Sequence, residues 1–139
     1  MNLDLSSLQK ALSSLYDALE VCAPERMSDV DAKTREVLRA GVIQNFEFTY
    51  ELCWKFIKRW LKSNLSPSIA DGVSRRELFR LAAENQLIGN VENWMSYHDA
   101  RNRTSHAYNP EIAKSVFDAA REFANDAERL LEALEARND

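Results

Sequence analysis

Apolar residues recur along most of this chain at the three- and four-residue spacing that is typical of an amphipathic helix. The first stripe predicts a helix that ends near Pro24, and its apolar positions are Leu5, Leu8, Leu12, Leu15, Leu19 and Cys22. A second helix is expected to begin near Ser28, whose hydroxyl can cap the free amides, and to continue to about Ser63. Gly41 is a candidate for a kink or a close helix crossing inside it. The face of this second helix consists of Val42, Phe46, Tyr50, Cys53, Ile57, Trp60 and Leu61.

The middle of the chain predicts a long loop followed by two shorter helices. The loop runs over about residues 64–72 and contains Pro67. Ser74 and Glu77 then have the spacing of a capping box and open a helix that should end before Gly89. A fourth helix is expected over about residues 91–104.

The last helix has a strong start signal. Asn109 is the expected cap, Pro110 occupies the first helical position, and Glu111 lies beside the positive end of the helix. No strand-like alternation competes anywhere, and only three Gly and three Pro in 139 residues argue against an all-β fold. We therefore predict a single all-α domain over residues 1–139, built as an up-and-down bundle of about five helices.

Composition also limits where the protein is expected to act. No apolar run approaches the roughly 18 residues that a membrane span needs, and no signal peptide is readable at the N-terminus. Cys22 and Cys53 both lie in apolar helical patterns, which predicts reduced core residues rather than a disulfide. We expect a cytoplasmic protein that does not bind a membrane.

The net charge of −4 hides an uneven distribution of charge along the chain. Residues 1–54 carry 5 basic and 9 acidic groups, and residues 104–139 carry 4 basic and 8 acidic groups. Residues 55–103 carry 9 basic and 5 acidic groups, which makes them the one electropositive part of the sequence. The overall acidity argues against nucleic-acid binding, whereas the basic middle segment leaves it open.

Several common kinds of site are excluded by spacing. Three isolated glycines cannot form a phosphate-binding Gly loop. His98, Asp99 and His106 are the candidate metal ligands, but the two histidines are eight residues apart and lack metal-site spacing. Ser105 adjoins His106, yet adjacent helical residues point away from each other, so a nucleophile–base pair is not expected. We predict no metal and no cofactor.

The group of residues that carries chemistry is Arg101-Asn102-Arg103-Thr104-Ser105-His106-Ala107-Tyr108. Arg101 is permanently charged and can bind a phosphate through its planar guanidinium, and His106 can exchange a proton near neutral pH. These two residue types suffice for metal-free cleavage of a phosphodiester, with Asn102 orienting the imidazole or donating to the phosphate. The alternative is structural: a histidine at a helix end and arginines in surface ion pairs.

Four segments of the chain together resemble the HEPN superfamily, and in particular its branch of nucleotidyltransferase substrate-binding proteins, or HepT-like toxins. They are residues 46–55, 76–88, 94–95 and 101–108. The most specific part of the resemblance is the Arg-x4-His-x-Tyr motif, which is intact at Arg101, His106 and Tyr108. The Glu-x3-Lys feature of the same family matches Glu51 and Lys55, although such a pair is common on any helix.

The resemblance implies a homodimer in which two Arg/His pairs share a cleft. It implies a metal-independent endoribonuclease that acts as a toxin on RNA, with Arg101, His106 and Asn102 as catalytic residues. It also implies a partner, a small MNT-type nucleotidyltransferase antitoxin, which can neutralise the toxin by attaching AMP to Tyr108.

Two other hypotheses remain open at this stage. The chain could be a non-catalytic subunit that holds a substrate or partner for a nucleotidyltransferase, and its acidic flanks would suit a basic partner surface. It could also be a plain interaction bundle in which Trp54, Trp60 and the apolar stripe of the first helix form a dimer seam.

Overall fold

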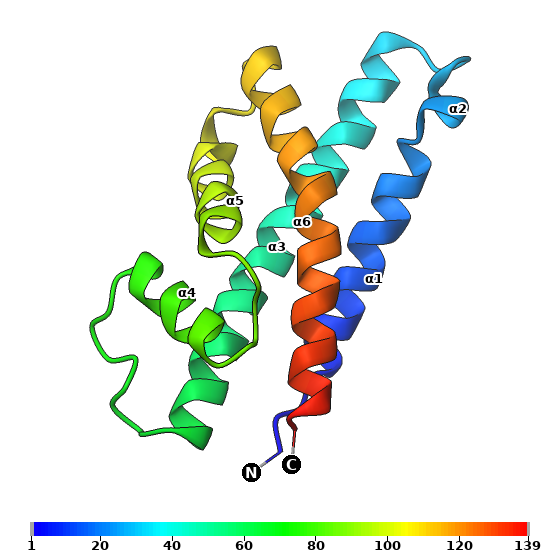
Figure 1. The fold of residues 1–139 in the computed structure, drawn as a ribbon. Coiled ribbons are helices and arrows are strands. Elements are labelled where there is room, and N and C mark those ends of the chain that lie inside the picture. The colour runs from blue at the N-terminus through cyan, green and yellow to red at the C-terminus, as the bar shows by residue number, and fades with distance from the viewer. Residues whose placement is uncertain (1, 139) are drawn as a thin grey trace.

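The computed structural model describes residues 2–138, and every regular element among them is helical. Three long helices, α1, α3 and α6, form the main body, while α4 and α5 pack on one side of it (Figure 1). The prediction of an all-α helical bundle is therefore confirmed. The helices are α1 (Ser6–Val21), α2 (Pro24–Met27), α3 (Ala32–Asn64), α4 (Arg75–Glu84), α5 (Val91–Arg103), the 3₁₀ helix η1 (Thr104–His106) and α6 (Pro110–Ala136).

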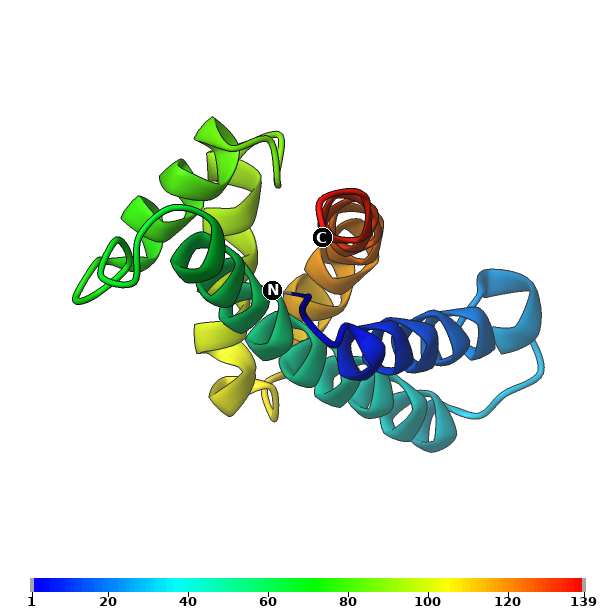
Figure 2. The same ribbon diagram turned by 90° about the horizontal axis from the view of Figure 1, so that it is seen from below.

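The helices run alternately up and down. In Figure 1, α1 rises from the N-terminus, α3 descends, α5 rises again, and α6 descends to the C-terminus. The two ends of the described chain meet at the bottom of the bundle, as the view from below confirms (Figure 2). Leu3 and Asn138 fix this closure, because the Asn138 side chain accepts from the Leu3 amide at 2.7 Å and donates to its carbonyl at 2.9 Å.

The start of the second long helix differs from the expectation. We predicted a cap at Ser28, but α3 begins after Asp31, whose carboxylate accepts a hydrogen bond from the Thr34 amide at 2.7 Å. Ser28 instead ends α2, a single turn with Pro24 at its first position that the sequence analysis did not predict. Ser28 and Asp31 are only three residues apart. Because the turn that begins at Pro24 extends to Ser28, the cap of α3 falls to Asp31.

The other caps form where the sequence placed them. Ser74 Oγ accepts from the Glu77 amide at 3.1 Å, although the Glu77 carboxylate pairs with Arg80 rather than returning to Ser74. Asn109 Oδ1 accepts from the amides of Glu111 and Ile112, which starts α6. Gly41 lies inside the continuous helix α3, and a side chain there would meet nothing within 4 Å, so it marks no close helix crossing.

The predicted apolar stripes form one core within the chain. The stripe of α1 packs against α3 and α6, and Leu8 and Leu15 are completely buried. Trp60 is only 8% exposed, and Trp54 is half-buried beneath other side chains. Leu8, Leu15 and Trp60 are thus covered by the same chain and leave little apolar surface for a dimer seam, whereas Trp54 keeps part of its surface exposed.

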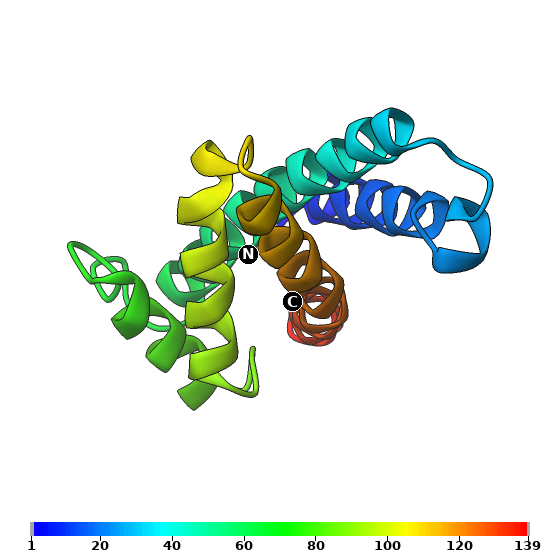
Figure 3. The same cartoon turned by 90° about the horizontal axis from the view of Figure 1, so that it is seen from above.

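A group of aromatic rings joins α3, α4, α5 and α6 around Phe123. The Phe123 ring lies 5.1 Å from that of Phe46, 5.3 Å from Tyr97 and 5.7 Å from Trp94, mostly in edge-on arrangements. Such packing makes the relative placement of α3, α5 and α6 well defined. It holds the C-terminal end of α5 beside α3, which is where the sequence motif lies (Figure 3).

Cys22 and Cys53 are both buried free thiols, as predicted for core residues, and burial raises the pKa of each. Over residues 2–138, no helix combines the length and the apolar character that crossing a bilayer requires.

Candidate functional site

The motif occupies the junction between α5 and α6. Arg101 and Asn102 lie in the last turn of α5, His106 is the final residue of η1, and Tyr108 follows in the turn before α6. Backbone hydrogen bonds keep this junction compact, since the Ala107 amide donates to Thr104 and the Asn109 amide donates to the His106 carbonyl at 3.0 Å. The motif is thus displayed on a short, ordered corner between two packed helices.

Arg101 is held by two carboxylates of α3. Its Nε donates to Glu51 at 3.1 Å, and its Nη1 lies 3.6 Å from a carboxylate oxygen of Glu47. Nη1 also donates to the Thr104 hydroxyl at 3.1 Å. Over residues 2–138, no bond from Nη2 is found, so one edge of the guanidinium stays available to a ligand.

Glu51 therefore takes a different role from the one expected. The family feature suggested a pair with Lys55, but Glu51 binds Arg101 and accepts from the Trp54 indole at 2.7 Å, while the Lys55 ammonium lies 5.7 Å from the Trp54 ring centre. Glu47 was not among the residues predicted from the sequence. The helical spacing could have identified it, because Glu47 precedes Glu51 by one turn and the two carboxylates share a face of α3.

Asn102 contacts a different histidine from the one proposed. Its amide nitrogen lies 3.4 Å from Nε2 of His98, one turn earlier on α5, and Nδ1 of His98 lies 2.9 Å from the Tyr50 hydroxyl. Both bonds are satisfied at once when His98 is neutral and carries its hydrogen on Nδ1. Burial, assisted by the charge of Arg75, lowers the pKa of His98 and favours that neutral form. Orientation of His106 by Asn102 is not observed in this structure.

His106 and Tyr108 lie at the surface. Their rings are 6.3 Å apart between centres and nearly perpendicular, and the Tyr108 side chain is 85% exposed. Within residues 2–138, no hydrogen bond joins His106 to Arg101 or Asn102. Over this range the chain therefore presents the arginine and the histidine of the motif as groups that do not bond to each other.

Tyr108 differs from the other three tyrosines in its environment. The Tyr16 hydroxyl donates to Glu128 at 2.7 Å, and partial burial raises its pKa to about 12. Tyr50 and Tyr97 are buried, and burial raises the pKa of both phenols, with Asp126 as a hydrogen-bond partner of Tyr97. Tyr108 is the tyrosine whose side chain extends into solvent.

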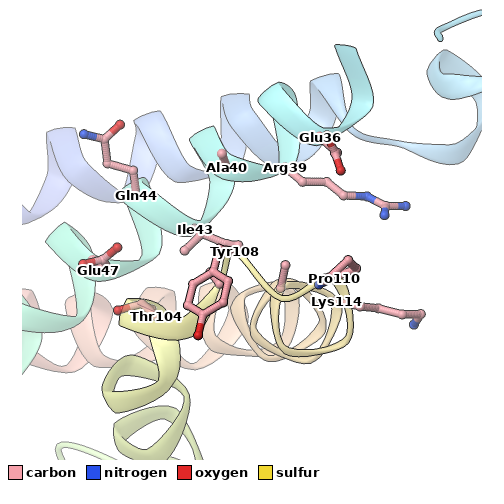
Figure 4. A pocket seen from close by; sticks show the side chains of 12 residues that line it. Glu36, Arg39, Ala40, Ile43, Gln44, Glu47, Thr104, Tyr108, Pro110 and Lys114 are labelled. Carbon is pink, nitrogen blue, oxygen red and sulfur yellow. The ribbon is translucent and has the colours of Figure 1, made fainter. Parts of the chain in front are cut away.

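A cavity of about 510 Å³ lies between α3 and the junction, with Tyr108 on its rim (Figure 4). The Arg39 and Lys114 side chains extend toward one end of it from α3 and α6. Glu36 and Glu47 also line it, so the cavity carries charges of both signs. Residues 2–138 contain no group of three or more His, Cys, Asp or Glu side chains arranged to hold a metal ion.

Comparison with known proteins identifies the class. The family described as nucleotidyltransferase substrate binding protein like matches residues 3–136. A Haemophilus influenzae protein described as probable ribonuclease HepT is 33% identical over 138 residues, which cover 98% of this chain and 94% of the relative. The chain belongs to the nucleotidyltransferase substrate binding protein like family.

Solved structures agree with this assignment. A Haemophilus influenzae structure, described as having the fold of a substrate binding domain of a nucleotidyltransferase, matches with a TM-score of 0.89 at 31% identity. That match covers 95% of this chain and 99% of the other. A crystal structure from Thermus thermophilus matches with a TM-score of 0.72 at 28% identity, covering 91% of this chain and 98% of its own. The family resemblance of the sequence is thereby confirmed.

Proposed function

We propose that this chain is a HepT-like toxin, a metal-independent endoribonuclease that uses Arg101 and His106. The observation that carries the proposal is the complete Arg-x4-His-x-Tyr motif, which is displayed on an accessible corner of the fold. A long polymer can reach such a corner without a deep pocket. The 33% identity to a protein described as probable ribonuclease HepT supports the same activity.

The chemistry needs one group to move a proton and one to stabilise charge. His106 takes the proton of a ribose 2′-hydroxyl, the 2′-oxygen attacks the adjacent phosphorus, and the bond to the 5′-oxygen breaks. A cyclic phosphate forms on one fragment, and the leaving 5′-oxygen receives a proton. Arg101 binds the phosphate and stabilises the negative charge that grows on it.

A homodimer supplies the second proton-transfer group. One histidine cannot easily act as base and acid in the same step, whereas two copies of His106 facing one cleft can divide these roles. Within the described part of the chain, Arg101 bonds to Glu51 and Thr104 and not to His106, which leaves the imidazole free to face a second copy of the chain.

The proposed partner is an MNT-type nucleotidyltransferase that acts as the antitoxin and attaches AMP to Tyr108. The phenol is 85% exposed, so a second protein can reach it, and it adjoins the cavity beside the motif. An attached nucleotide adds bulk and negative charge next to Arg101 and His106. RNA binding is weakened by both effects.

Purified protein incubated with RNA in EDTA tests the proposal. We expect the wild type to cut RNA, and Arg101→Ala and His106→Ala to lose at least about 100-fold in rate. Arg129→Ala is the matched control, because it removes an equal charge from an exposed position on α6. Equal rates for wild type and the two motif variants, with unmodified Tyr108 verified by mass spectrometry, would refute the ribonuclease.

The second candidate function is a non-catalytic subunit that holds a substrate or partner for a nucleotidyltransferase. The pairing of Arg101 with Glu47 and Glu51 favours it, because the charge of the arginine is partly neutralised. The deciding measurement uses the co-purified complex. Nucleotide transfer that requires this chain, together with no RNA cleavage by the chain alone, would establish the binding role.

A further inference from the structure

A second cavity, of about 450 Å³, lies between the C-terminal half of α3, the loop after it, and helices α4 and α5. Lys58, Arg75, His98 and Trp54 line it, and the rest of its wall is apolar or glycine. No carboxylate is among its lining residues. In a chain of net charge −4, this cavity therefore collects fixed positive charge without a neutralising acid.

The two cations of the cavity have no ion-pair partner among residues 2–138. The Arg75 Nε is buried and makes no hydrogen bond within the same range. A buried polar group without a partner is costly, so such groups in folded proteins usually have a ligand or an unusual role. Lys58 is half-buried on the neighbouring helix and adds a second donor.

The Arg75 guanidinium is fixed in place by stacking. Its central carbon lies 3.7 Å from the centre of the Trp54 ring, close enough for a strong cation–π contact. Stacking occupies one flat face of the guanidinium, and the N–H of the buried Nε has no acceptor within residues 2–138. A planar guanidinium presented in this way matches a phosphate group.

The cavity is directly connected to the motif. Trp54 donates to one oxygen of Glu51 at 2.7 Å, and Arg101 donates to the other at 3.1 Å. His98 lies in the wall of the cavity and also contacts Asn102. The indole of Trp54 and the carboxylate of Glu51 thus link Arg75 to Arg101.

We propose that the Lys58–Arg75 cavity binds a phosphate group of the RNA strand and aligns that strand with Arg101 and His106. The inference rests on the proposed ribonuclease function and adds a binding subsite outside the motif. His98, which burial favours in its neutral form, adds no third positive charge to the wall of the cavity. The subsite explains how an acidic protein retains a polyanionic ligand.

Binding of a short fluorescein-labelled single-stranded RNA oligonucleotide tests the subsite. The measurement is made in a His106→Ala background, which separates binding from cleavage. A protein that carries Lys58→Gln and Arg75→Gln is compared with a matched control that carries Lys62→Gln and Arg80→Gln, exposed cations on the same two helices. We expect the first pair to reduce the slope of log affinity against log salt by about 0.7, because the cavity binds one phosphate group and each lost phosphate contact contributes about 0.7.

Lys58→Gln alone leaves the Arg75–Trp54 stack intact. This single variant keeps the test decisive if the double variant fails to fold. Its expected slope change is smaller than about 0.7, because Arg75 still contacts the phosphate. Identical slopes for the cavity and control variants would overturn the subsite. AMP that binds with the same dependence on both cations would assign the cavity to a free nucleotide and would likewise overturn it.

Cleavage assays separate this inference from the proposed function. If the wild type cleaves RNA and the cavity and control variants have the same salt slope, the subsite is refuted and the ribonuclease proposal stands. If RNA binding depends on Lys58 and Arg75 but the wild type does not cleave RNA, the cavity is supported as a binding site and the ribonuclease proposal is refuted.

Discussion

Arg101 of α5 donates through its Nε to Glu51 of α3 across 3.1 Å, a contact between residues fifty positions apart in sequence. The cation of the motif is therefore bound to a carboxylate in the free protein. A phosphate that binds Arg101 must compete with this carboxylate and with that of Glu47. The acidic pair on α3 limits the affinity of the site for anions.

Glu51→Gln should tighten RNA binding in the His106→Ala background by up to about fivefold, because an ion pair with this exposure contributes about 1 kcal/mol or less. The glutamine oxygen can still accept from the Trp54 indole, so the local packing is kept. Fluorescence anisotropy with labelled RNA measures the effect. Glu132→Gln, an exposed change of equal charge on α6, is the control. Weaker binding by Glu51→Gln would mean that the carboxylate positions Arg101 rather than competing with RNA.

His98 should make stability depend on pH. Burial lowers its folded-state pKa below the ordinary 6.5, so the unfolded chain binds the proton more readily. This contribution to stability is fully present above about pH 6.5 and is lost as the pH falls toward the folded-state pKa. Urea unfolding at about pH 7.5 and about pH 5.5 measures the loss. His98→Gln should reduce the difference in stability between the two pH values, and His106→Gln serves as the control. A pH dependence that His98→Gln leaves unchanged would contradict the prediction.

Asn109→Ala should lower the free energy of unfolding by about 1 kcal/mol, since the Asn109 side chain caps two amides of α6. The same change loosens the corner that carries His106 and Tyr108, so RNA cleavage should fall with it. Asn109→Ser keeps a capping oxygen and should retain most of the stability. Urea unfolding and the EDTA cleavage assay provide both readouts. A stable but inactive Asn109→Ser variant would show that the amide has a role beyond capping.

Phe123→Ala should lower the free energy of unfolding by about 3–5 kcal/mol. The substitution leaves a cavity at the centre of the aromatic group that joins α3, α5 and α6. Phe48, which is 58% exposed on α3, provides the contrast. Phe48→Ala should change the free energy of unfolding by about 0.5 kcal/mol or less. Chemical denaturation of both variants checks the difference, and similar losses would mean that Phe48 is covered in solution.

The helices were predictable because they depend on local signals. The apolar spacing, the Ser74 cap and the Asn109–Pro110 start are each contained within a few residues, and all appear in the structure. The start of α3 was misplaced because Ser28 and Asp31 are both good caps. Only the packing of the turn at Pro24 selects between them.

The candidate site was predictable in its motif but not in its contacts. Arg101, His106 and Tyr108 could be recognised together because they lie within eight residues. The pairing of Arg101 with Glu47 and Glu51 depends on how α5 packs across α3, which no short segment encodes. The same packing partly neutralises the basic segment of residues 55–103, because Glu47 and Glu51 of the acidic segment 1–54 pair with Arg101.

The exposure of Tyr108 gives the protein a natural position for a chemical label. A reagent that nitrates or iodinates phenolate should modify Tyr108 first, since Tyr16, Tyr50 and Tyr97 have raised pKa values and hydroxyls bound to neighbouring groups. Both cysteines are buried and do not compete for such reagents. The corner beside His106 can therefore carry a spectroscopic reporter without any change to the amino-acid sequence.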